Sequence, residues 1–80
     1  MKYIVFEGFA GEQIPIIFPK RILHEEMREQ VPYSKVLSAG YVLFNNDKFL
    51  CYGDVKELNT RARQEEDSQI IAEHLLKLSQ

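Results

Sequence analysis

Residues 35–53 have the sequence KVLSAGYVLFNNDKFLCYG, in which two apolar segments flank an Asn-Asn-Asp triplet. Asn and Asp tolerate the positive φ that tight hairpin turns require, so this pattern predicts a β-hairpin. A loop at Asn46 and Asp47 pairs Phe44 with Phe49, whereas a loop one residue earlier would place Phe44 opposite Asp47. Because like side chains favour cross-strand pairing, we expect the first register.

The rest of the chain supplies a second hairpin and two helices. Runs of β-branched and aromatic residues predict strands, and apolar residues spaced four apart predict helices. Pro19 can open the first helix, and Pro32 ends it. The acidic residues 65–67 fall in the first turn of the last helix, where the helix dipole favours negative charge. The expected elements are strands 2–6 and 14–18, a helix over 20–30, the central hairpin, a short helical turn near 54–57 and a helix from about residue 64.

This order, ββαββα, predicts a single α+β domain over residues 1–80. Short hairpins pair antiparallel, and two amphipathic helices can cover one face of a four-stranded sheet. We therefore expect an antiparallel four-stranded sheet with both helices packed on one face. Pro15 cannot donate a ladder hydrogen bond, which places its strand at an edge or at a strand end. Gly40, in mid-strand, indicates a bulge or the close approach of another group.

Both faces of the predicted central hairpin are apolar. A sheet with one solvated face should alternate apolar and polar residues, and two helices suffice to cover only one face. The other face would expose a patch of the kind that marks an interaction site. The residues expected on this self-association surface are Tyr41, Leu43, Leu50 and Tyr52.

The size of the chain favours association with another protein. An 80-residue domain is marginally stable unless a disulfide, a metal or a partner supports it, and Cys51 is the only cysteine. We expect a homodimer related by a two-fold axis, with a second sheet packed on the surplus face. A larger partner protein is one alternative. A compact monomer, in which the first hairpin folds over that face, is another.

The titratable residues form no catalytic or metal-binding pattern. Cys51 would need a nearby base to act as a nucleophile, and a mid-strand cysteine among large apolar neighbours is expected to be a buried hydrophobe. His74 lies on the apolar side of the last helix and is expected to be a neutral core histidine. His24 has no second His or Cys at ligand spacing, whereas a zinc site needs three or four ligands. We expect no enzyme activity, no cofactor and no metal.

Exposed Tyr and Arg side chains are the candidates for contact with a host protein, since both residue types are favoured at interfaces. They are Tyr33, Arg61 and Arg63. The two arginines precede an acidic cluster, and salt bridges to Glu65 or Glu57 are the preferred interpretation of their role. The net charge of −2 and the pI near 5.6 argue against general binding of nucleic acid. A small nucleic-acid-associated regulator stays the alternative function.

The N-terminal apolar run is too short for a signal peptide, and no run approaches the roughly 18 apolar residues of a membrane span. A single unpaired cysteine suits a reducing compartment. We therefore expect a cytoplasmic protein without a membrane-spanning segment.

Three short sequence motifs in the C-terminal half resemble those of a group of known proteins. They are Ser-Ala-Gly at 38–40, Cys-Tyr-Gly at 51–53 and Glu-Asp-Ser at 66–68. With these motifs, the C-terminal half resembles small uncharacterised proteins encoded by bacteriophages and prophages. The resemblance implies a bacterial or phage cytoplasmic origin and an accessory role, without an assigned activity. Independently of the resemblance, the surplus apolar face and the lack of a catalytic pattern predict a small non-enzymatic protein-interaction module.

Overall fold

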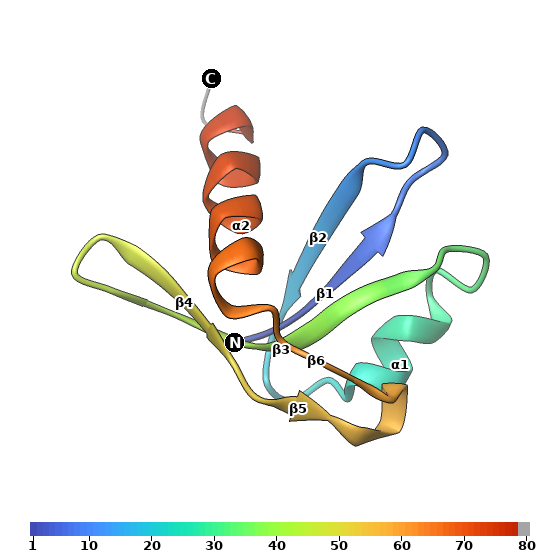
Figure 1. Ribbon diagram of the computed structural model, residues 1–80. Helices are drawn as coiled ribbons and strands as arrows, with labels where there is room; N and C mark the ends of the chain where they lie inside the picture. Colours follow the sequence, from blue (N-terminus) through green and yellow to red (C-terminus); the bar gives the residue numbers. More distant parts are fainter. Residues whose placement is uncertain (79–80) are drawn as a thin grey trace.

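A computed structural model describes residues 1–78 of the chain. Its four main strands form one antiparallel sheet in the order β2-β1-β3-β4 (Figure 1), and the predicted α+β class with two α-helices is confirmed. The elements are β1 (Lys2–Glu7), β2 (Gln13–Phe18), α1 (His24–Glu29), β3 (Val36–Asn45), β4 (Lys48–Tyr52), β5 (Asp54–Val55), the 3₁₀ turn η1 (Lys56–Leu58), β6 (Thr60–Arg61) and α2 (Gln64–Leu78).

The central hairpin has the predicted loop and register. Asn46 and Asp47 adopt positive φ angles of 52° and 61°, as the central residues of a type I′ turn do. Phe44 pairs with Phe49, and the ladder continues to Tyr41 opposite Tyr52. The like-with-like pairing of aromatic and aliphatic side chains therefore fixes this register.

The long strand β3 pairs with two different strands along its length. Its first half pairs with β1, where Tyr41 lies opposite Lys2, and its second half pairs with β4 from Tyr41 to Asn45. The tip of the β3–β4 hairpin therefore extends past the end of β1, and it diverges from the β1–β2 hairpin (Figure 1). This tip is a two-stranded ribbon with two faces to cover.

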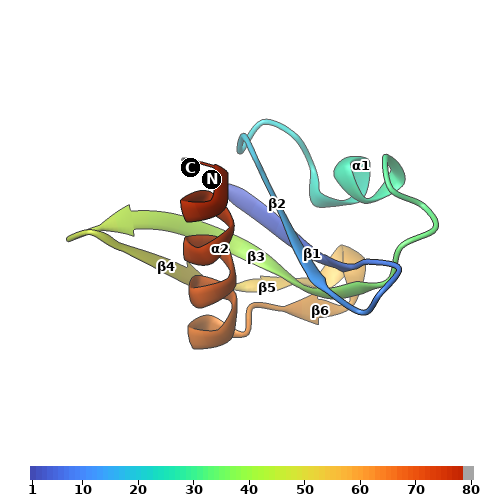
Figure 2. The same ribbon diagram turned by 90° about the horizontal axis from the view of Figure 1, so that it is seen from above.

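The two helices pack on opposite faces of the sheet, and the prediction that both share one face was wrong. Ile71 of α2 packs with Tyr3 and Val5 of β1, whereas Met27 of α1 packs with the cluster formed around Ile4 and Phe6. Successive strand residues point to opposite faces, so the unbroken apolar run of β1 requires cover on both sides. The helices also lie far apart along the sheet (Figure 2).

Two local elements differ from the sequence prediction. Helix α1 spans only six residues, because the segment after Pro19 first makes a tight turn in which Ile22 N–H donates to the Pro19 carbonyl. The turn near 54–57 is a 3₁₀ turn between two short paired strands, β5 and β6. Its Val55 is buried on the same face as α1, so this segment supplies cover that α1 is too short to give.

Gly40 is explained by the close approach of other groups. A Cβ at this position would lie 2.5 Å from the carbonyl oxygen of Tyr52 and 3.0 Å from Cβ of Ala62. The bulge in the β1–β3 ladder lies elsewhere, between Val5 and Phe6. Of the two alternatives for Gly40, the close approach is the one observed.

Candidate interaction surface

The face of the β3–β4 hairpin turned away from α2 carries the four residues predicted for self-association, which we call the hairpin patch: Tyr41, Leu43, Leu50 and Tyr52. Leu43, Leu50 and Tyr52 are 43%, 44% and 41% exposed. The rings of Tyr41 and Tyr52 stack with centroids 5.7 Å apart, which holds both at the base of the patch. The structure thus brings the four residues together on one surface.

The hairpin patch stays open because the cover on the α1 face stops short of it. Tyr41 is half-buried against the ring of His24, at 5.4 Å between centroids, and α1 lies over the wide part of the sheet. On the opposite face of the hairpin, Val42 and Cys51 are buried beneath α2. Toward the tip of this face Phe44 is 61% exposed, so α2 covers the base of the hairpin and not its tip. At the base, the two apolar faces therefore differ in cover.

The three residues predicted to contact a host partner do not form one surface. The fully exposed Tyr33 lines a surface hollow of about 630 Å³ together with Phe9 and Ile14. Arg61 and Arg63 border a different hollow, beside Gly53 and Asp54. Tyr33 and the arginines therefore belong to separate regions of the molecule.

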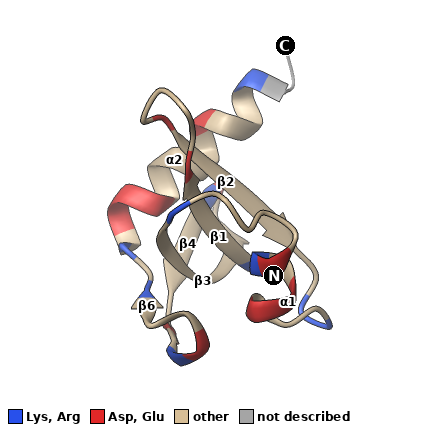
Figure 3. Ribbon diagram, turned by 90° about the vertical axis from the view of Figure 1, so that its right-hand side faces the viewer, with Lys and Arg blue, Asp and Glu red and all other residues tan. Residues whose placement is uncertain are grey.

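Arg63 makes intramolecular contacts. Its Nη1 pairs with Glu66, its Nε donates to Asp67 at 3.0 Å, and its Nη2 donates to the Gln13 side chain at 2.8 Å. Salt bridging was the preferred expectation for this arginine, but its acidic partners are Glu66 and Asp67 rather than Glu65 or Glu57. On the side drawn in Figure 3, Lys and Arg segments alternate with acidic ones and form no continuous basic stripe.

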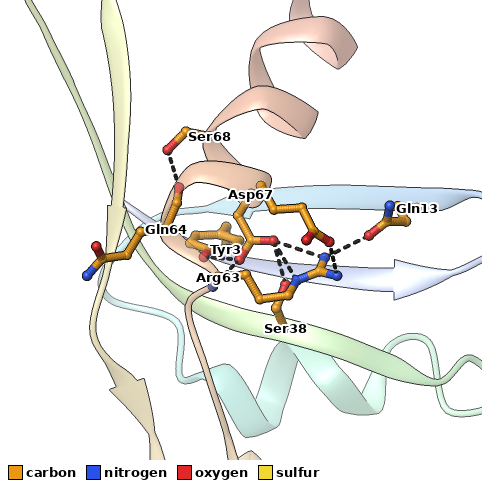
Figure 4. Close-up of polar contacts among 8 residues, drawn as sticks. Tyr3, Gln13, Ser38, Arg63, Gln64, Asp67 and Ser68 are labelled. Carbon is orange, nitrogen blue, oxygen red and sulfur yellow. Dashed lines mark hydrogen bonds and ion pairs between the residues drawn. The ribbon is translucent and has the colours of Figure 1, made fainter.

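Asp67 is the centre of a buried polar cluster that the sequence analysis missed (Figure 4). Its carboxylate is fully buried and accepts hydrogen bonds from the hydroxyls of Tyr3 (2.5 Å) and Ser38 (2.8 Å). It also accepts from the backbone N–H of Arg63 at 2.8 Å. The spacing contained the signal, since Asp67 and Ile71 are four residues apart and therefore share a helix face.

The Asp67 cluster ties β1, β3 and the start of α2 together and has a structural role. Burial and the adjacent Asp67 carboxylate raise the pKa of the Tyr3 hydroxyl far above its ordinary value, so Tyr3 stays protonated and donates. The hydroxyl protons of Tyr3 and Ser38 are both donated to Asp67, so these hydrogen bonds compensate for the burial of its carboxylate.

The prediction that His74 is the core histidine was wrong. His24 is the buried one, with Nε2 2.9 Å from the Gly40 carbonyl and its ring between Phe18 and Tyr41. Burial lowers its pKa below the ordinary value. His74 is only half-buried, because the buried face of α2 runs through Ile71 and passes to one side of it.

Cys51 is a buried free thiol, as predicted, and burial raises its pKa. It lies on the α2 face of the sheet, whereas His24 lies on the α1 side, so the two do not form a nucleophile–base pair. Among residues 1–78, no three His, Cys, Asp or Glu side chains gather to hold a metal ion. Neither helix of the same range has the length and apolar character that a membrane span requires.

Comparison of the chain with protein-family models, with curated proteins and with solved structures gave no match.

Proposed function

We propose that the protein is a small non-enzymatic interaction module that forms a homodimer through the hairpin patch. The observation that carries this proposal is the uneven cover at the base of the hairpin. Val42 and Cys51 are buried on the α2 face, where only the tip residue Phe44 is largely exposed, whereas Leu43, Leu50 and Tyr52 form a contiguous open surface on the other face. Fully burying a large apolar side chain contributes about 1.5–3 kcal/mol. Completing the burial of Leu43, Leu50 and Tyr52, each a little over two-fifths exposed, would contribute about half of that per residue.

A second copy suits this surface better than a charged partner does. The hairpin patch contains two leucines and two tyrosines and no charged side chain. A two-fold axis places the same patch on both subunits, so an apolar surface becomes its own complement. A domain of 80 residues also has little core of its own and gains stability from association.

The proposal includes contact with a host protein at a second place. Tyr33 and Phe9 are fully exposed aromatic side chains beside one surface hollow, and aromatic residues are enriched at interfaces. Arg61 is exposed on another side of the molecule. An accessory role in the cytoplasm, of the phage or prophage type, belongs to the same proposal and is supported by the sequence resemblance alone.

The alternative, a nucleic-acid-associated regulator, has less support. It would need free cationic side chains along one surface, and the guanidinium of Arg63 is engaged with Asp67 and Glu66. Binding that weakens steeply with salt and is lost in Arg61→Ala would favour this alternative.

The test of the proposed function is the molar mass by light scattering of the wild type and of Leu50→Glu. Ile14→Glu is the matched control, because Ile14 is also an apolar strand residue and is 40% exposed, but lies on the opposite edge of the sheet. We expect wild type and Ile14→Glu at twice the 9.4 kDa chain mass, and Leu50→Glu at the monomer mass. Equal masses for all three proteins would contradict the assignment of the surface.

A further inference from the structure

The outer edge of β4 has backbone groups that point away from its neighbour. In an antiparallel pair, residues alternate between exchanging both backbone hydrogen bonds with the opposite strand and pointing away from it. Val42 shows which residues of the β3–β4 pair point away from each other, because its N–H and C=O bond to Met1 at 2.8 and 3.0 Å instead of to β4. Cys51, opposite Val42, and Phe49, two residues earlier, therefore direct their N–H and C=O groups outward.

We propose that β4 pairs antiparallel with β4 of a second copy, across a two-fold axis at Leu50. This geometry rests on the proposed homodimer and specifies its interface. With Leu50 on the axis, Phe49 faces Cys51 of the second copy. Each of these pairs exchanges two backbone hydrogen bonds, so the outward groups of Phe49 and Cys51 are satisfied in both subunits. The two sheets join into one of eight strands.

The side chains of β4 fit the same register. Leu50 packs against its own copy on the open face of the hairpin, and Lys48 of the second copy lies beside Tyr52, so Leu50 and Tyr52 lose exposed surface through contacts across the axis. Lys48 is the only charged residue of β4, and it falls opposite Tyr52 of the second copy rather than opposite itself. A lysine beside an aromatic ring is a favourable cross-strand pair, whereas two lysines would repel each other.

The other edge of the sheet is protected, which is the reason for choosing β4. β2 carries Pro15 in mid-strand, and proline at an edge removes a donor and discourages the addition of a further strand. The sequence of β4, KFLCY, contains no proline or acidic residue. An edge strand that lacks proline, is uncharged at its centre and is flanked by an apolar face is suited to pairing with its own copy.

The experiment is disulfide trapping in a Cys51→Ala background. Leu50→Cys is compared with Leu43→Cys, which lies on the same face and is 43% exposed against 44% for Leu50. In the proposed dimer the two copies of position 50 have Cα atoms about 4.5 Å apart, within the span of a disulfide. The two copies of position 43 are one strand farther out on each side, which places them about 14 Å apart. We expect oxidised glutathione to convert most of the Leu50→Cys protein to covalent dimer, and at least ten-fold less of the Leu43→Cys protein.

The outcomes separate this geometry from the proposed function. Equal trapping at both positions, or trapping at neither in a Cys51→Ala protein of dimeric mass, would overturn the edge pairing and leave the homodimer standing. A monomeric mass for the wild type and for Cys51→Ala, with neither variant trapped, would overturn both. Circular dichroism of the Cys51→Ala parent checks that the background is folded.

Discussion

Replacing Asp67 with Asn should lower the free energy of unfolding of the domain, because Asp67 links α2 to the sheet. The carboxylate accepts four hydrogen bonds, from Tyr3, Ser38 and the backbone N–H and Nε–H of Arg63. An amide nitrogen in place of one oxygen turns two of these acceptor positions into donors. The hydroxyl that faces it can rotate and accept, but neither N–H of Arg63 can.

The size of the effect follows from which contacts are lost. A hydrogen bond to a charged group contributes about 1.5–3 kcal/mol, and removing one partner of a buried ion pair costs about 3–5 kcal/mol. The guanidinium of Arg63 is partly exposed, at 31%, so water recovers some of the loss, and we expect about 2–4 kcal/mol for Asp67→Asn. A domain of this length has a total free energy of unfolding of about 4–12 kcal/mol, so the expected loss is a large part of it.

The assay is urea denaturation followed by circular dichroism at one protein concentration, because association changes the apparent stability. Glu66→Gln is the control, since Glu66 pairs with the same arginine but is 56% exposed, and its loss should stay within about 1 kcal/mol. Tyr3→Phe removes one donor and should cost about 1–2 kcal/mol. An Asp67→Asn protein that is no less stable than Glu66→Gln would refute the assignment of Asp67 as the centre of the cluster.

Two further predictions concern Gly40 and His24. Gly40→Ala should lower the free energy of unfolding by about 1–3 kcal/mol, because its Cβ would meet the Tyr52 carbonyl oxygen at 2.5 Å; an unchanged urea midpoint would contradict this. Burial lowers the pKa of His24 in the folded state. The contribution of neutral His24 to the free energy of unfolding is therefore complete above about pH 6.5, the pKa in the unfolded state. This contribution is lost as the pH falls through the folded-state pKa. The urea midpoint of the wild type should therefore fall more between pH 7.5 and 5.5 than that of His24→Leu, and equal falls would count against a buried neutral His24.

The sequence predicted those parts of the fold that depend on neighbours along the chain. The loop at Asn46 and Asp47 required residues that accept positive φ, and the pairing of Phe44 with Phe49 set the register. The start of α2 near Gln64 also followed from local signals. Each of these features is decided within a few residues.

The features that the sequence analysis missed depend on contacts between distant segments. The placement of α1 and α2 on opposite faces follows from the two buried sides of β1, which alternate Tyr3 and Val5 with Ile4 and Phe6. Asp67 was interpreted as a helix-dipole residue alone, because two of its donors, Tyr3 and Ser38, come from the distant strands β1 and β3. The hairpin patch was predicted from apolar alternation, and its residues do share a face, but whether a second copy covers it stays a prediction.

Self-association is measured by the molar mass of the wild-type protein in light scattering, over a dilution series. The account predicts a mass of twice 9.4 kDa that falls toward the monomer mass on dilution, since the interface is formed by a few apolar side chains and a short strand edge. A mass of 9.4 kDa at every concentration would contradict it, and the hairpin patch would then have to be covered by a different protein.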